Sequence, residues 1–276
     1  FNVGKSTKLK ITKAIQATIQ DAIQMAIDSI QYLSENNKTV FFDAEHFFDG
    51  FKEDSNTSLK FLDSVLQTEL DTFVLCDTNG GTLPDEVHEI ISRVNSEFPS
   101  ANFGVHFQND NGCAVANSLV AVELGVKHVQ GTINGYGERT GNADLCTLIP
   151  NLSLKKDYET IPKDSLKQLT PIAKHIAELV NVSIDSRHPY IGSSAFTHKA
   201  GLHASGMAKD SSLYEHVDSS LVGNFTRTTV SELAGRASVF TKAEEFGINF
   251  DNENAKKLYD KIANNTGFEL YELKRN

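Results

Sequence analysis

The run FGVHFQND, Phe103 to Asp110, combines a buried-strand pattern with side chains that can bind metals or carry protons. Side chains two positions apart on a strand point to the same face, so His106 and Gln108 are predicted to lie side by side. Asn109 and the carboxylate of Asp110 follow directly. An imidazole and an amide together at a strand end suggest a site that binds a ligand.

Polar side chains follow all four predicted strands, not only this one. The carboxyl ends of parallel strands meet at one edge, where α/β proteins place their sites. Oxygen ligands with one imidazole suit Mg²⁺ or Mn²⁺ better than a closed structural zinc site. Any one of these residues alone, Asp77 or Asn79 for example, could be an ordinary turn or capping residue, but four consecutive strand ends share the pattern. The candidates are Asp43, Glu45 and His46; Asp77, Thr78 and Asn79; His106, Gln108, Asn109 and Asp110; and Asn134, Glu138, Arg139 and Asn142.

Several single residues have both a functional and a structural interpretation. Glu45 could be a general base, or the orienter of one, or a carboxylate in an ordinary salt bridge. Glu138 and Arg139 are interpreted as a structural ion pair that holds the last loop. His203 lies among glycines and serines, which favours a functional role over a helix cap. Tyr214 would ordinarily be a half-buried packing residue.

The candidate residues are positioned by repeated strand, loop and helix patterns. Isoleucines at helical spacing predict a helix over 13–32, and leucines predict another over 57–69. A third helix is predicted to start with Thr82 as N-cap and Pro84 in the first turn, and a fourth to end at Gly125. The strands are predicted to begin the segments TVFFDAEHFF, TFVLCDTNGGTLPDEVHEII, NFGVHFQND and HVQGTINGYGERTGN.

Four such units in a row predict parallel strands with right-handed crossovers. A dinucleotide-binding fold is disfavoured, because no G-x-G-x-x-G occurs in the required setting. We therefore predict half of a (β/α)8 barrel over residues 1–150. Beyond Pro150 the strand pattern stops. A linker and helical subdomain with a histidine-rich loop is predicted over 151–220, and a second small helical subdomain over 221–276.

Composition limits the class of protein. The formal net charge of −10 over 276 residues argues against a nucleic-acid or anionic-membrane partner. The sequence contains no apolar run of about 20 residues and no visible signal peptide. The irregularly spaced Cys76, Cys113 and Cys146 predict neither a disulfide framework nor a zinc site. These features predict a soluble cytoplasmic protein. Because the chain starts at Phe1, within a strand-like run, we expect upstream residues in the whole protein.

Long motifs in this chain resemble one known family. FFDAEHFFDG, LCDTNGGTLP, NDNGCAVANSL, VQGTINGYGERTGNADLC and AFTHKAGLHASG together closely resemble the citramalate synthases. Those enzymes belong to the wider isopropylmalate and homocitrate synthase family of metal-dependent barrels that condense acyl-CoA. The likeness continues through YEHVDSSLVGN and VSELAGRASV, so it covers nearly the whole chain.

The resemblance implies a Claisen condensation of acetyl-CoA with a 2-oxo acid, pyruvate, to give citramalate and CoA, as in isoleucine and other branched-chain amino-acid biosynthesis. The 2-oxo acid would bind a divalent cation, Mg²⁺ or Mn²⁺. It further implies a homodimer in which the smaller subdomain serves the partner's barrel. By motif position, the implied metal ligands are His106, Gln108 and Asn142; the implied acid–base residues are Glu45, His203 and Tyr214; and the implied substrate contacts are Thr78 and Asn79.

Two departures from the family pattern matter. The family has His-x-His-Asn-Asp where this chain has Gln108 in place of the second histidine, and we expect weaker metal retention. The strand with the family's Asp-Arg motif, the next two strands and the usual C-terminal effector domain are not in this chain. We therefore expect the C-terminal half of the barrel, inactive by itself. The alternatives are an isopropylmalate or homocitrate synthase and, in another class, a non-catalytic oligomerisation or regulatory subunit.

Overall fold

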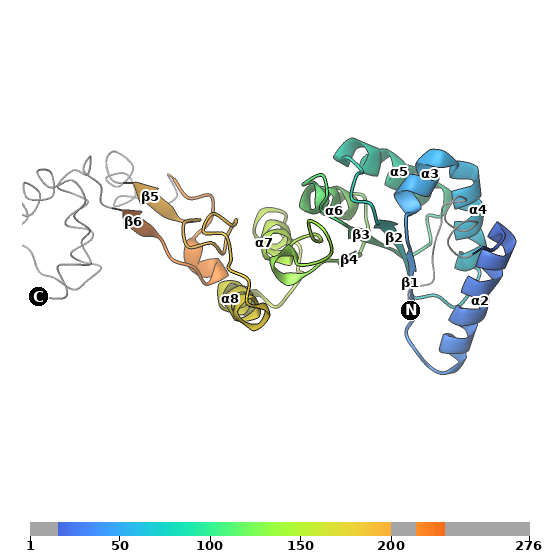
Figure 1. The fold of residues 1–276 in the computed structure, drawn as a ribbon, viewed down its shortest axis with the longest axis horizontal. Helices are drawn as coiled ribbons and strands as arrows, with labels where there is room; N and C mark the ends of the chain where they lie inside the picture. The colour runs from blue at the N-terminus through green and yellow to red at the C-terminus, as the bar shows by residue number, and fades with distance from the viewer. Residues whose placement is uncertain (1–15, 200–213, 230–276) are drawn as a thin grey trace, which may run out of the picture. The chain divides into compact units, whose positions relative to one another are not determined.

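A computed structural model describes residues 16–199 and 214–229 (Figure 1). The chain divides into two compact units, residues 1–149 and 150–276, and each is described by itself. The predicted organisation in three parts, with boundaries at 150 and 220, stays a prediction.

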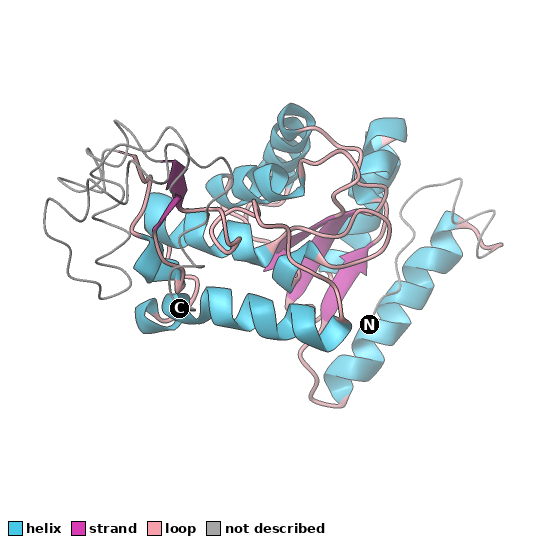
Figure 2. Ribbon diagram, turned by 60° about the vertical axis from the view of Figure 1, so that its left-hand side comes forward, coloured by secondary structure: helices cyan, strands magenta, loops and turns pink. Residues whose placement is uncertain are grey.

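The first unit contains a four-stranded parallel sheet in the order β1-β2-β3-β4. Neighbours in the sheet are also neighbours in the sequence, which is the arrangement of successive strands in a (β/α)8 barrel. The strands are drawn side by side in Figure 2. The strands are β1 Phe41–Ala44, β2 Thr72–Asp77, β3 Phe103–Phe107 and β4 His128–Gln130, and the helices are α2 Ile19–Glu35, α3 Phe47–Glu53, α4 Ser55–Leu66, α5 Pro84–Glu97 and α6 Ala114–Glu123.

One face of the sheet packs against the helices. Side chains of alternate strand residues on this face join a single buried cluster with isoleucine, leucine and valine side chains of α2, α4 and α5. Burying these side chains is the main stabilisation of the unit. The strand residues in this cluster are Phe42, Ala44, Phe73, Leu75, Phe103, Val105 and Phe107.

The opposite face carries the polar side chains, and contacts across it show that the sheet is curved. In a flat sheet β1 and β4 would lie about 14 Å apart, three strand spacings. Yet the amide of Gln130 donates to the carboxylate of Asp43 at 2.9 Å, and the rings of Phe41 and His128 lie 4.9 Å apart. The sheet therefore curves with its polar face inward, as a barrel wall does.

Helix ends differ in detail from the sequence prediction. Helix α2 begins at Ile19 and not near Lys13, because Thr18 caps it: the Thr18 hydroxyl accepts from Asp21 N, and the Asp21 carboxylate accepts from Thr18 N. Residues 16–18 lie outside this helix, and residues 13–15 lie outside the described part. Helix α4 spans Ser55–Leu66 rather than 57–69, with Asp54 as its cap.

The N-cap of α5 is also one residue later than predicted. The N-cap is Leu83, whose backbone N–H donates a hydrogen bond to the Glu86 carboxylate at 2.8 Å. Pro84 is the first helical residue. Thr82 N donates to the Asp77 carboxylate at 3.0 Å instead. The predicted end of α6 is confirmed, since Gly125 follows it with a φ of +97°.

The second unit contains more than helices in its described residues. Two short parallel strands, β5 and β6, pair here with Thr197 beside Arg227, where the sequence pattern predicted no strands. Helix α7 extends across the boundary between the units. The elements are α7 Leu145–Lys155, η2 Lys163–Gln168, α8 Leu169–Val180, β5 Thr197–Lys199, η4 Ser219–Val222 and β6 Arg227–Thr229. Within the described ranges, no helix is both long and apolar enough to span a bilayer.

Candidate metal and acid–base site

His106 lies at the centre of a chain of polar contacts on the inner face of the sheet. Its Nδ1 lies 3.0 Å from Gln130 Oε1, on β4. Gln130 Nε2 in turn donates to Asp43 Oδ1, on β1, at 2.9 Å. On its other side, His106 Nε2 lies 3.4 Å from Gln108 Nε2. The ring is therefore contacted on both sides, by Gln130 at Nδ1 and by Gln108 at Nε2.

Gln108 and Asn142 face each other across an isolated antiparallel bridge. The hydrogen bonds Asn109 N to Gly141 O, 2.8 Å, and Ala143 N to Phe107 O, 3.0 Å, flank the pair. In such a non-hydrogen-bonded pair the Cα atoms are about 4.5 Å apart, so the side chains lie close together. The structure thus brings together three predicted metal ligands, because Gln108 also contacts His106.

The amide oxygens of this pair have the properties of ligand atoms. Gln108 Oε1 and Asn142 Oδ1 are buried, and neither accepts a hydrogen bond from any residue in the described ranges. A buried acceptor left unpaired costs about 1–3 kcal/mol. Asn142 Nδ2 is satisfied, since it donates to Tyr136 O at 2.9 Å. Two unpaired oxygens beside one imidazole fit a hard divalent cation.

Acidic and thiol side chains do not form this set. Among the described residues, no three His, Cys, Asp or Glu side chains gather in a way that could hold a metal ion. Cys76 pairs in register with His106, but burial raises its pKa well above the ordinary value, and the charges of Asp43, Glu45 and Asp77 raise it further. The thiol therefore stays protonated and is a poor ligand.

The loops after β1 and β2 meet at Thr78. Its Oγ1 accepts from His46 N at 2.7 Å, and His46 adopts a left-handed φ of +60° directly after Glu45. Glu45 is half-buried. Asn79 is exposed and donates to Asp49 at 2.5 Å, and the imidazole of His46 lowers the pKa of Asp49. Glu45, Thr78 and Asn79 thus lie in adjoining loops, and their roles stay predictions.

Arg139 ties three loops together, although its predicted partner was Glu138. Its Nε and Nη2 donate to the two oxygens of Asp110 at 2.8 and 2.9 Å, and Nη2 also donates to Thr78 O at 2.8 Å. The contact with Glu138 is longer, 3.9 Å. The predicted ion pair is therefore secondary, because the planar guanidinium matches the Asp110 carboxylate. Hydrogen bonding to Arg139 holds the pKa of Asp110 below its usual range.

Asp77 has the structural role that its turn position suggested. It is 1 % exposed, and its carboxylate accepts from Thr82 N at 3.0 Å, which fixes the turn before α5. Burial raises the pKa of this carboxyl group. Gly80, in the same turn, has a φ of +67°, and a Cβ there would lie 2.4 Å from Asp110 Oδ2. This close approach explains why a glycine stands at the position.

The remaining predicted residues belong to the second unit. Tyr214 is 42 % exposed, and His203 lies outside the described residues. Next to Tyr214, the nearly buried Glu215 accepts from Thr226 Oγ1 at 2.6 Å and lies 3.3 Å from His198 Nε2. His198, before residues 200–213 in the sequence, is therefore in contact with Glu215, after them.

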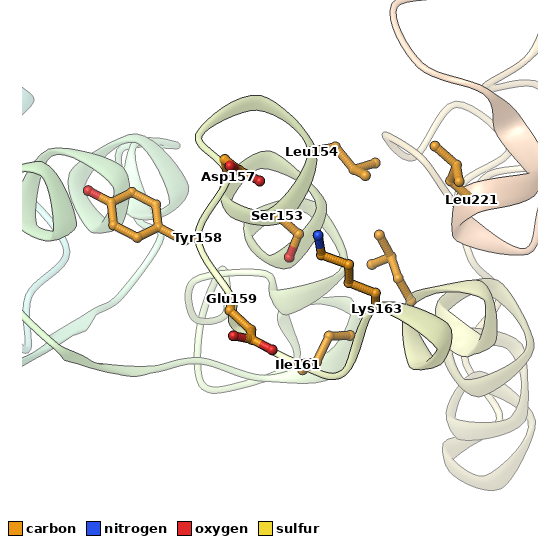
Figure 3. A pocket seen from close by; sticks show the side chains of 9 residues that line it. Ser153, Leu154, Asp157, Tyr158, Glu159, Ile161, Lys163 and Leu221 are labelled. Carbon is orange, nitrogen blue, oxygen red and sulfur yellow. The ribbon is translucent and has the colours of Figure 1, made fainter.

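The second unit contains a hollow of about 500 Å³. Its wall mixes charged side chains with apolar ones, as labelled in Figure 3. It contains Asp157, Glu159 and Lys163 beside Ile161 and Leu221, and none of the predicted site residues. Its size alone assigns it no chemistry.

Gln130 contacts the candidate site but was not among the residues predicted from the sequence. In the segment HVQ, Gln130 stands two positions after His128 and therefore points inward with it. That alternation was a usable signal. His106 pairs with Gln130 in register on the neighbouring strand β3, but Asp43 lies three strands away on β1, and only the curvature brings it within reach.

The chain matches two protein-family models. HMGL-like covers residues 2–176, and Homocitrate synthase post-HMGL domain-like covers residues 190–267. Among solved structures, the HMG-CoA lyase of Bacillus subtilis has a TM-score of 0.58 at 20% identity, covering 67% of this chain and 64% of that one. These likenesses, together with the curved parallel sheet, confirm the predicted partial barrel.

Curated proteins give higher identities. The (R)-citramalate synthase of Aquifex aeolicus is 48% identical over 94% of this chain and 49% of its own length. The (R)-citramalate synthase of Geobacter sulfurreducens is 45% identical over 92% and 48%. The 2-isopropylmalate synthase of Pyrococcus furiosus is 29% identical over 90% and 50%. The chain thus spans about half the length of the curated relatives it matches.

Proposed function

The chain belongs to the HMGL-like family, and on that basis we propose that it condenses acetyl-CoA with a 2-oxo acid. The products would be CoA and, with pyruvate as the acceptor, (R)-citramalate. The observation that carries this proposal is the set of His106, Gln108 and Asn142, with two buried amide oxygens directed at no described donor.

The choice of pyruvate rests on the relatives. Five proteins named (R)-citramalate synthase are 41–48% identical to this chain, whereas a 2-isopropylmalate synthase is 29% identical. This difference favours citramalate over isopropylmalate as the product. The implied pathway is the synthesis of isoleucine and other branched-chain amino acids, in the cytoplasm.

In this proposal His106, Gln108 and Asn142 hold a divalent cation, Mg²⁺ or Mn²⁺. When bound, the cation would polarise the keto carbonyl of the 2-oxo acid as a Lewis acid. The fit comes from the donor types, one imidazole nitrogen with two neutral oxygens. Since Cys76 stays protonated, it would not compete for the cation.

Glu45 would act as the base that takes a methyl proton from acetyl-CoA. The enolate carbon would then bond to the keto carbon of pyruvate, and the carbonyl oxygen would take up a proton to become the hydroxyl group. Water would hydrolyse the thioester to release CoA and citramalate. Glu45 stands between the end of β1 and the left-handed His46, which directs the chain into α3. The charge of Glu45 contributes to the raised pKa of the buried Cys76, which supports a position of Glu45 at the inner face of the sheet.

Thr78 would bind the carboxylate of the 2-oxo acid. Its oxygen already accepts from His46 N, so its hydroxyl proton can be donated to the substrate. Asn79 is proposed to contribute a second donor, through the amide hydrogen that Asp49 does not use. His203 and Tyr214 are proposed to assist from the smaller subdomain at the barrel mouth of the partner in a homodimer.

The test is the steady-state rate of CoA release by the full-length protein, with Mn²⁺ or Mg²⁺ present. Pyruvate, 2-oxoisovalerate and 2-oxoglutarate are compared as acceptors. Preference for pyruvate supports the proposal, while preference for either other acid favours the isopropylmalate or homocitrate synthase alternative.

One observation favours a function of another class. Gln108 occupies the position of the second histidine in the family's motif, and this departure favours a homologue kept for assembly or regulation. If the full-length protein binds no divalent cation and releases no CoA with any of the three acids, this non-catalytic role replaces the proposed one.

A further inference from the structure

Two residues with no assigned role, Asp43 and Gln130, connect His106 to the opposite edge of the curved sheet. They lie on β1 and β4, and their side chains are half-buried on the inner face. The sequence separates them by 87 positions, yet their side chains are hydrogen bonded at 2.9 Å. His106 Nδ1 lies 3.0 Å from the other end of the same amide.

This geometry fixes the direction of each hydrogen bond. An ionised carboxylate can only accept, so the group that Gln130 presents to Asp43 must be its NH₂. The reverse orientation would place two oxygens against each other with no proton between them. Gln130 therefore presents Oε1 to the imidazole. Since Oε1 only accepts, Nδ1 of His106 must carry the proton.

The contact on the far side of the ring agrees with this assignment. With the proton on Nδ1, the neutral ring has a lone pair on Nε2. Gln108 Nε2, a donor, lies 3.4 Å from it. An acceptor lone pair facing a donor is consistent, whereas a protonated Nε2 facing the same NH₂ would be repelled.

We propose that Asp43 and Gln130 are positioning residues that hold His106 in its Nδ1-protonated tautomer, with Nε2 facing Gln108, the bridge partner of Asn142, before a metal binds. The consequence for metal affinity rests on the proposed function, but the tautomer does not. Ligating histidines usually donate their second N–H to such a partner, and loss of the partner typically costs about 10–100-fold in affinity. Here an amide stands between carboxylate and imidazole, so the carboxylate acts by orienting the amide.

The first test reads the tautomer in the metal-free protein. Nitrogen-15 spectra of histidine-labelled protein at about pH 8 distinguish the protonated ring nitrogen from the bare one. The His106 signals are assigned by their absence in His106→Asn. We expect one tautomer, protonated at Nδ1, in the wild type. In Gln130→Met, which preserves length but removes the acceptor, we expect both tautomers.

A more conservative substitution, Asp43→Asn, tests the same role if Gln130→Met fails to fold. Asp43→Asn keeps the size of the side chain but can face Gln130 with either amide end, so Gln130 loses its single orientation. We expect a mixture of His106 tautomers in Asp43→Asn, with a smaller loss of Mn²⁺ affinity than in Gln130→Met. The matched control is Gln24→Met, because Gln24 Nε2 makes the same kind of bond to Asp28, at 2.7 Å, on the exposed surface of α2.

The second test is calorimetry of Mn²⁺ binding to the full-length protein and these variants. We expect Gln130→Met to bind about 10–100-fold more weakly and Gln24→Met to bind as the wild type does. A single Nδ1-protonated tautomer in both Gln130→Met and Asp43→Asn would overturn the inference. If the wild type binds no Mn²⁺ but the variants still lose the tautomer, the positioning role stands and the proposed function fails.

Discussion

Gln108 and Asn142 face each other as a non-hydrogen-bonded pair across an isolated antiparallel bridge, at the end of β3 and in the loop beyond β4. Their amide oxygens are both buried and accept no hydrogen bond from the described part of the chain. A bridge of this kind keeps two side chains adjacent even when their loops differ in length. A substitution at Gln108 therefore tests whether this pair binds a metal ion.

Replacing Gln108 with histidine should strengthen metal binding. An imidazole nitrogen is a better donor than a neutral amide to Mn²⁺, which accepts nitrogen ligands. We expect Gln108→His to bind Mn²⁺ about 10-fold more tightly, equal to about 1.4 kcal/mol, by titration calorimetry. Gln24→His on exposed α2 is the control. Unchanged affinity in Gln108→His would mean that residue 108 is not a ligand.

Replacing Glu45 with glutamine should stop the chemistry without loosening the metal. Loss of a general base typically lowers kcat by about 10²–10⁴-fold. We expect that fall in CoA release by Glu45→Gln of the full-length protein, with unchanged Mn²⁺ affinity. Glu53→Gln, at the exposed end of α3, should keep the wild-type rate. A Glu45→Gln protein with normal kcat would remove Glu45 from the mechanism.

The ion pair between Asp110 and Arg139 should stabilise the fold in a pH-dependent way. Arg139 lowers the pKa of Asp110 below its ordinary 3.8, so the contribution is complete above that value and is lost as the pH falls through the lower, folded-state pKa. We expect the melting temperature of the wild type to exceed that of Asp110→Asn at about pH 7, and the gap to narrow below about pH 4. Asp63→Asn, exposed on α4, is the control. A gap independent of pH would contradict the ion pair.

The three cysteines should differ in reactivity. Cys76 and Cys146 are buried, and burial raises the pKa of both thiols, to about 12 for Cys146. Cys113 is only half-buried. We expect iodoacetamide to modify Cys113 first in the native protein, and the other two only after unfolding in urea, by mass spectrometry of the peptides. Early modification of Cys76 would contradict a protonated, enclosed thiol.

Adjacent glycines at 80 and 81 provide a matched pair for backbone strain. An alanine at 80 would need a left-handed φ and would meet Asp110 Oδ2 and N, whereas a Cβ at Gly81 meets nothing within 4 Å. We expect Gly80→Ala to lower the free energy of unfolding by about 1–3 kcal/mol in urea denaturation. Gly81→Ala should change it by about 0.5 kcal/mol or less. Equal effects would remove the special role of Gly80.

Local patterns explain which parts of this molecule could be predicted from its sequence. The four consecutive strand, loop and helix patterns predict the parallel sheet, because parallel strands need a crossover between them. The helix caps were less predictable, because Thr82 has the right chemistry for α5 but stands one residue before the actual N-cap, Leu83. Strands β5 and β6 contain three residues each, too few to show a period.

The site residues divide in the same way. His106, Gln108 and Asn142 could be named from strand-end position and motif. The contacts of Gln130 and Arg139 could not, because each joins loops or strands far apart in the chain. Glu138 is next to Arg139 in the sequence, but the guanidinium of Arg139 binds the carboxylate of Asp110, which it meets with the better geometry.

The bond between Gln130 and Asp43 also bears on how the first unit folds. Contacts between residues 87 positions apart form late, because the intervening chain must lose its freedom first. β1 can be held in this way only after β4 has docked. Amide protons of all four strands should therefore exchange with solvent together, as one cooperative block. The slowest step in folding this block should be the closure of β1 and β4 on each other.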